Sequence, residues 1–118
     1  MVAPLTTGAT VNRSVQLSAR LVGCCACLIR HAPGAAPKST VFAEGFLGND
    51  LVVRHDGNVY VTFPDWEKGQ NSTVMHVSPS GKQQPVDKGI KFANGICLSP
   101  DQSLLYVADS RSHWVYSY

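Results

Sequence analysis

The feature of this sequence that most constrains its fold is an internal repeat of about 45 residues. Asn49 in the first copy corresponds to Asn94 in the second, and Asp56 corresponds to Asp101 at the same spacing. The two copies run over residues 49–62 and 94–109. A period of this length, filled by several short strands, is typical of the blades of a β-propeller.

Each copy is expected to form a strand, a tight turn and a second strand. The strands are rich in β-branched and aromatic residues, which suit a pleated, half-buried surface. Gly57 supplies the positive φ that a tight turn needs, and Pro100 presets φ in the second turn. Tyr106 lies one residue later than its counterpart Tyr60 predicts, so the second turn carries one inserted residue. We expect strands near residues 50–54, 58–63, 73–78, 95–99, 104–108 and 113–118, a short strand near 84–86, and no long helix.

These strands predict an all-β fold, a β-propeller fragment of about two blades, each a four-stranded antiparallel sheet. A single blade cannot bury both of its faces, and propellers have roughly four to eight blades, so 118 residues are too few to close a ring. We divide the chain into a poorly defined N-terminal segment, residues 1–39, and a partial propeller domain, residues 40–118. The alternative fold is a small meander or sandwich without propeller closure.

The N-terminal segment differs in composition from the rest. Residues 1–40 hold four basic residues and no acidic one, whereas the remainder holds six basic and eight acidic residues. The longest apolar run, Leu21–Ile29, is too short to span a membrane, and no convincing signal peptide is present. We expect residues 1–20 to pack loosely and residues 21–30 to add a strand beside the first blade. A cytoplasmic location is slightly favoured, while a lipoprotein signal or an organelle transit peptide stays open.

Composition also excludes some classes of function. A net charge of +2 without a Lys/Arg-rich run argues against a nucleic-acid partner. The four cysteines lack the paired spacing of a zinc site, and the absence of a Gly-x-Ser-x-Gly motif argues against a serine hydrolase. His76 and His113 are expected at equivalent third-strand positions, which favours blade packing over catalysis.

Two stretches resemble a known family: EGFLGNDLVVRHDGNVYVT, residues 44–62, and FANGICLSPDQSLLYVADSRSHWVYSY, residues 92–118. They are similar to central blades of the senescence-marker-protein/gluconolactonase/luciferin-regenerating-enzyme family. Members are six-bladed propellers that hold a divalent cation, often calcium, in the central channel and hydrolyse lactones or related esters. The resemblance implies that the full-length protein is such a hydrolase of a small-molecule lactone or ester. The alternative is a non-catalytic propeller that binds a ligand or a protein.

The resemblance also implies roles for four residues. Asn94 matches a metal-ligating Asn of the family, and Asn49 matches an Asn that contacts substrate or metal-bound water, which makes both candidates for the metal site. We expect their side chains to converge at the axis-facing ends of neighbouring blades, where Asn offers a neutral oxygen to a hard cation. The alternative is a turn Asn that caps its own backbone. Asp50 and Asp109 are expected to organise the loops around the site.

Several family features have no match in this chain. Glu44 lies only five residues before Asn49, which is the wrong blade for the family's first metal-ligating Glu. The family's late Asp, a ligand and general base, is expected beyond Tyr118. We therefore expect at most half of the ligand set here and assign no catalytic residue, which leaves open whether this fragment alone is an enzyme.

Overall fold

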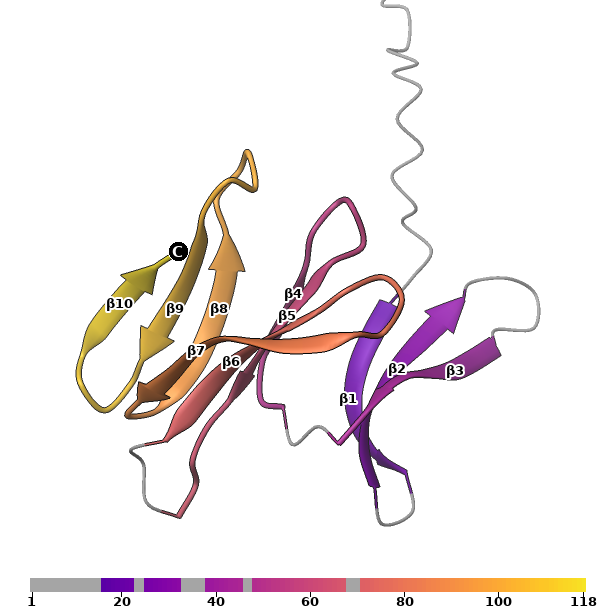
Figure 1. Cartoon of the computed structure of the whole chain (residues 1–118), viewed down its shortest axis with the longest axis horizontal. Helices are drawn as coiled ribbons and strands as arrows, with labels where there is room; N and C mark the ends of the chain where they lie inside the picture. The colour runs from indigo at the N-terminus through magenta and orange to yellow at the C-terminus, as the bar shows by residue number, and fades with distance from the viewer. Residues whose placement is uncertain (1–15, 23–24, 33–37, 46–47, 68–70) are drawn as a thin grey trace, which may run out of the picture.

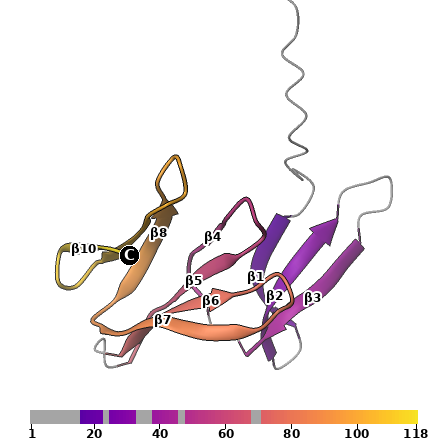
Figure 2. The same cartoon turned by 45° about the horizontal axis from the view of Figure 1, so that its top comes forward.

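The computed structural model describes residues 16–22, 25–32, 38–45, 48–67 and 71–118, with side chains described from Thr40 onward. All regular elements in these ranges are strands, and none of these residues belongs to a helix that could cross a membrane. The strands form three antiparallel sheets that stand side by side (Figure 1 and Figure 2). The predicted all-β fold is therefore confirmed, as a set of stacked sheets.

The first sheet has the order β1-β2-β3 and lies at the N-terminal end of the stack. Its strands are β1 (Gln16–Val22), β2 (Cys25–Ala32) and β3 (Lys38–Glu44). β2 overlaps the strand that we expected over residues 21–30, and it pairs with β3 from Cys27 to Ala32. Residues 1–15, on which most of the expectation of loose packing falls, lie outside the described ranges. The division of the chain near residue 40 stays a prediction.

The middle sheet has four strands in the order β4-β5-β6-β7. They are β4 (Leu51–Val53), β5 (Val59–Phe63), β6 (Ser72–Val77) and β7 (Gln83–Ile90). The first three match their predicted positions, whereas β7 is much longer than the short strand expected near residues 84–86. β7 contains Pro85, which a sheet tolerates on an edge strand because proline donates no ladder hydrogen bond.

The third sheet has the order β10-β9-β8. Its strands are β8 (Ala93–Leu98), β9 (Leu105–Asp109) and β10 (Trp114–Ser117). Six residues separate the paired Leu98 and Leu105, one more than the five between the paired strands β4 and β5. The inserted residue predicted for the second turn is therefore confirmed.

The predicted equivalence of His76 and His113 is wrong. His113 lies in the turn before β10 with a positive φ of 61°. The strand registers pair Thr62 with Val74 and Ala108 with Val115, so Val115 is the counterpart of Val74 in the repeat. The strand predicted near residues 113–118 does overlap β10, and only the alignment of the two histidines fails, because the loop before β10 (residues 110–113) is shorter than the loop before β6 (residues 64–71).

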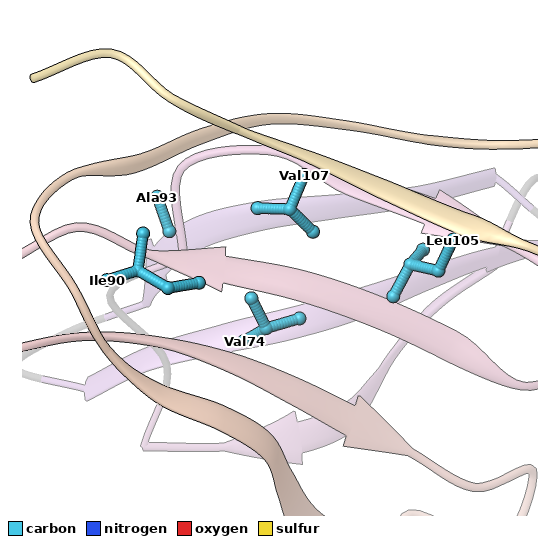
Figure 3. Close-up of a cluster of buried hydrophobic side chains, with 5 residues drawn as sticks. All are labelled: Val74, Ile90, Ala93, Leu105 and Val107. Carbon is cyan, nitrogen blue, oxygen red and sulfur yellow. The ribbon is translucent and has the colours of Figure 1, made fainter. Parts of the chain in front are cut away.

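Two apolar clusters hold the sheets together. One joins β3 to one face of the middle sheet and contains Ala43, Val59, Val61 and Val77. The other joins the opposite face to the third sheet (Figure 3) and contains Val74, Ile90, Ala93, Leu105 and Val107. On β5, Val59 and Val61 belong to the first cluster and Tyr60 packs against the second. Alternate residues of the strand therefore face opposite sides of the sheet, as its period of two requires. The middle sheet is packed on both sides, which is how a blade is stabilised by its neighbours.

Candidate functional site

Asn49 and Asn94 meet at one end of the interface between the middle and third sheets. Asn49 precedes β4, and Asn94 is the second residue of β8. The Nδ2 group of Asn49 donates a hydrogen bond of 2.6 Å to Oδ1 of Asn94. Nδ2 of Asn94 in turn donates to Oγ of Ser110 over 3.0 Å. The expected convergence of the two Asn side chains is confirmed, while their roles toward metal and substrate stay predictions.

Close packing fixes the segment that carries Asn49. The Asn49 N–H donates to the carbonyl oxygen of Thr62 over 2.9 Å. A Cβ atom on the preceding Gly48 would lie 2.5 Å from Cγ1 of the buried Val61, closer than any such contact can be. Glycine is therefore required at position 48 for the backbone to lie this close to β5.

Asn94 occupies a β-bulge. The register between β8 and β9 pairs Ala93 with Asp109 and then Ile96 with Val107. Two residues of β8, Asn94 and Gly95, therefore lie opposite the single residue Ala108 of β9 and are not paired with it. A bulge bends the strand and changes the direction of a side chain, and such features are frequent beside functional sites. The bulge frees Asn94 from the alternation of its strand and lets it face Asn49.

Asp50 connects the two sheets. Its Oδ1 accepts the N–H of Leu51 at 2.9 Å, and its Oδ2 accepts the N–H of Ile96 at 3.2 Å. Both carboxylate oxygens are thus engaged by backbone donors, one in β4 and one in β8. Asp50 holds the backbone on both sides of the Asn49–Asn94 pair.

Thr62, which the sequence did not single out, lies beneath this pair. Its side chain is fully buried, and its Oγ1 donates to the carbonyl oxygen of Asn94 over 2.7 Å. The signal available in the sequence was a small hydroxyl residue between Val61 and Phe63 in the largely apolar run of β5. Such a hydroxyl requires a hydrogen-bond partner.

Asp109 is buried, with 1% of its surface exposed, and organises the neighbouring loops. It accepts hydrogen bonds from the backbone N–H groups of Lys91, Phe92, Arg111 and Ser112. Burial raises the pKa of Asp109, but the hydrogen bonds from Ser112, Phe92 and Arg111 outweigh it and hold the pKa at about 2. Asp109 is therefore ionised at neutral pH. It holds both the backbone segment that leads into β8 and the turn that follows β9.

An aromatic cluster lies beside the bulge. The ring of Trp66 meets Phe92 edge to face at 5.0 Å, and the Arg111 guanidinium lies 4.8 Å from the centre of the same ring. Trp66 is 62% exposed. This cluster, also not singled out from the sequence, offers an aromatic surface and a positive charge next to the segment that leads into Asn94.

The residues at this end fit part of a hard-cation site. Asn49 and Asn94 offer neutral carbonyl oxygens, the kind of ligand that Ca²⁺ accepts, but Ca²⁺ takes roughly six to eight oxygens and usually includes carboxylates. The described part of the chain contains no group of three or more His, Cys, Asp or Glu residues placed to hold a metal ion. The pair therefore supplies two ligands of the right type and does not form a complete site by itself.

Comparison with known proteins agrees with the fold and the motifs. Residues 38–118 match the sequence profile described as the SMP-30/Gluconolactonase/LRE-like region. A gluconolactonase of Zymomonas mobilis subsp. mobilis is 34% identical over 83 residues, which cover 58% of this chain and 23% of that protein. The chain thus spans about a quarter of the length of this relative. No solved structure matches it significantly. The profile match over most of the chain confirms the resemblance, and the chain belongs to the SMP-30/gluconolactonase/LRE-like family.

Proposed function

We propose that this chain forms part of a six-bladed β-propeller that hydrolyses a lactone or related ester with the help of a divalent cation, Ca²⁺, bound at Asn49 and Asn94. Membership of the family supports lactone hydrolysis. The observation that carries the placement of the site is the 2.6 Å contact between Asn49 and Asn94, which brings two amide side chains from neighbouring sheets to one point.

In this proposal the chain's own residues hold and orient the reacting groups. Asn94 and Asn49 would bind the cation through their Oδ1 atoms, which requires the hydrogen bond from Nδ2 of Asn49 to Oδ1 of Asn94 to open so that both oxygens face the cation. Ser110 accepts the Nδ2 hydrogen bond of Asn94 and so fixes which way that amide faces, a support role typical of residues behind a metal ligand. A bound cation supplies Lewis-acid polarisation of the lactone carbonyl. The Nδ2 group of Asn49 is a donor that can stabilise negative charge on a substrate oxygen.

The 118-residue chain tests the cation site. Two neutral oxygens do not offset the dehydration of a divalent ion, so we expect Ca²⁺ to bind with a Kd of about 1 mM or weaker, with negligible turnover. Asn94→Asp adds a carboxylate and should tighten binding about tenfold, because ligand charge sets affinity. Asn71→Asp, an exposed change before β6, is the matched control and should have little effect. Calorimetric titration measures all three, and equal effects of the two variants would contradict the site.

Lactone hydrolysis is tested in the full-length protein by acid release from an aldonolactone at constant pH. We expect a chelator to abolish turnover and Asn94→Ala to lower kcat/KM at least tenfold. Turnover that survives both treatments would rule out the proposed site. Lactone binding without turnover would instead favour a non-catalytic, ligand-binding propeller.

A further inference from the structure

Thr62 is a polar residue in an otherwise apolar strand interior. It lies on β5 and is fully buried, and the neighbouring Val61 belongs to the apolar cluster on the opposite face. A valine at position 62 would fill similar space without needing a partner. A buried hydroxyl destabilises a fold unless it is hydrogen-bonded, so its presence directs attention to its partners.

The hydroxyl of Thr62 links both halves of the candidate site. Its Oγ1 accepts the N–H of Asp50 at 3.1 Å and donates to the carbonyl oxygen of Asn94 at 2.7 Å. A longer contact of 3.3 Å runs from the same hydroxyl to the Asp50 carbonyl oxygen. The backbone of Thr62 adds bonds of 2.9 Å to Asn49 and to Asp50. One residue therefore contacts the segment of Asn49 with its backbone and the segment of Asn94 with its side chain.

The bond to Asn94 matters because Asn94 lies in the bulge. Asn94 is not paired with a residue of β9, so the hydrogen bonds between β8 and β9 do not fix the position of the Asn94 carbonyl group. Apolar packing between the sheets is non-directional and does not fix a single backbone group. A hydrogen bond with a preferred length and angle does so. The Thr62 hydroxyl supplies that bond from the neighbouring sheet.

We propose that Thr62 is a positioning residue, whose hydroxyl sets the spacing between Asn49 and Asn94 by holding the bulge of β8 against the start of β4. This inference rests on the proposed function, since the site that Thr62 positions is the proposed cation site. Geometry held to within a fraction of an ångström is what ligand and substrate placement requires. Thr62 itself touches neither cation nor substrate in this proposal.

The experiment compares three variants of the 118-residue chain by NMR, with no cation or lactone present. Thr62→Val removes the hydroxyl, Thr62→Ser keeps the hydroxyl and removes the methyl group, and Thr73→Val removes a hydroxyl from the same sheet as a matched control. The readout is the pair of side-chain NH₂ signals of Asn49 and Asn94. We expect Thr62→Val to move both pairs toward the values of free asparagine, and the other two variants to leave them in place.

Each outcome decides the inference. If Thr62→Val leaves both NH₂ pairs unchanged, the hydroxyl does not position the site and the proposal is wrong. If Thr62→Val does not fold, Thr62→Ser decides alone: unmoved signals support the role of the hydroxyl, and displaced signals show that the methyl group holds the segment instead.

A second readout separates this inference from the proposed function. In the Asn94→Asp background, Thr62→Val should weaken Ca²⁺ binding at least threefold, and Thr62→Ser should restore it. If Ca²⁺ does not bind preferentially to Asn94→Asp at all, the proposed function fails, while the NMR result still reports on the spacing of the pair. If Ca²⁺ binds but Thr62→Val leaves its affinity unchanged, the positioning role is overturned.

Discussion

Replacing Asp109 by Asn tests whether a buried carboxylate holds the candidate site in place. In the native chain Oδ1 of Asp109 accepts the N–H groups of Phe92, Arg111 and Ser112 at 3.0 to 3.2 Å, and Oδ2 accepts that of Lys91 at 3.0 Å. Asparagine keeps the first oxygen but places an NH₂ group opposite the Lys91 N–H. One donor is then left without a partner, and three bonds lose the assistance of the negative charge.

The loss of unfolding free energy in Asp109→Asn can be estimated in two ways. Hydrogen bonds to charged groups contribute about 1.5–3 kcal/mol each and neutral ones about 0.5–1.5 kcal/mol, so a simple sum over one lost and three weakened bonds gives an upper limit of roughly 4.5–7.5 kcal/mol. The depression of the Asp109 pKa from 3.8 to about 2 corresponds to about 2 kcal/mol at neutral pH. We expect Asp109→Asn to lower the free energy of unfolding by about 2 kcal/mol, the value given by the pKa depression, because four bonds that converge on one carboxylate do not add.

Urea unfolding followed by circular dichroism measures this loss. With a slope of about 2 kcal/mol/M, the midpoint should fall by about 1 M at pH 7. Glu67→Gln, which removes a negative charge from an exposed turn, is the control and should shift the midpoint little. An unchanged midpoint in Asp109→Asn would refute the assignment of Asp109 as a structural carboxylate.

The effect should also depend on pH. The folded pKa of Asp109 is lower than its unfolded value, so its stabilisation is present above about pH 4 and is lost as pH falls through 2. The difference between wild type and Asp109→Asn should therefore shrink between pH 4 and pH 2. Hydrogen bonds from Ser99 and Ser103 also hold the pKa of the exposed Asp101 at about 2, but Asp101 titrates in both proteins and cancels in the difference. A difference that is constant over this range would contradict the mechanism.

Two further predictions concern packing and ionisation. Gly48→Ala places a Cβ 2.5 Å from Cγ1 of Val61 and should destabilise the fold by about 1–3 kcal/mol in urea unfolding; a variant as stable as wild type would show that β4 can shift freely. Burial, followed by the 2.5 Å hydrogen bond from its hydroxyl to Asp87, raises the pKa of Tyr118 above its usual value. Spectrophotometric titration should show a late tyrosine step that Tyr118→Phe removes, and a late step that persists would assign it to another residue.

The repeat made part of the site predictable. Equivalent positions in neighbouring sheets lie at the same end of the stack, so the 45-residue spacing of Asn49 and Asn94 implied that their side chains meet, as they do. The hairpin strands were predictable for the same reason, because alternation and turn residues are local signals.

Other features depend on partners far away in the sequence and were not predictable. β7 extends to Ile90 through Pro85 and Gly89, which read as strand breakers but are tolerated where the strand lies at the sheet edge. The bulge at Asn94 leaves no trace in alternation, since it is defined by the pairing of β8 with β9. The role of Thr62 depends on a carbonyl 32 residues later in the chain.

The segment from Lys91 to Ile96 shows why polar side chains gather at this end of the stack. It leaves the outermost strand of one sheet and enters β8 of the next, and the bulge removes part of its ladder pairing. Three side chains hold its backbone instead: Asp109 binds the first two N–H groups, Thr62 the carbonyl of the bulge, and Asp50 the N–H of Ile96. A buried backbone needs such partners wherever the ladder is interrupted. The interruption and its three supports together present the Asn side chain in the bulge to the neighbouring sheet, so local loss of regular structure creates the geometry of the candidate site.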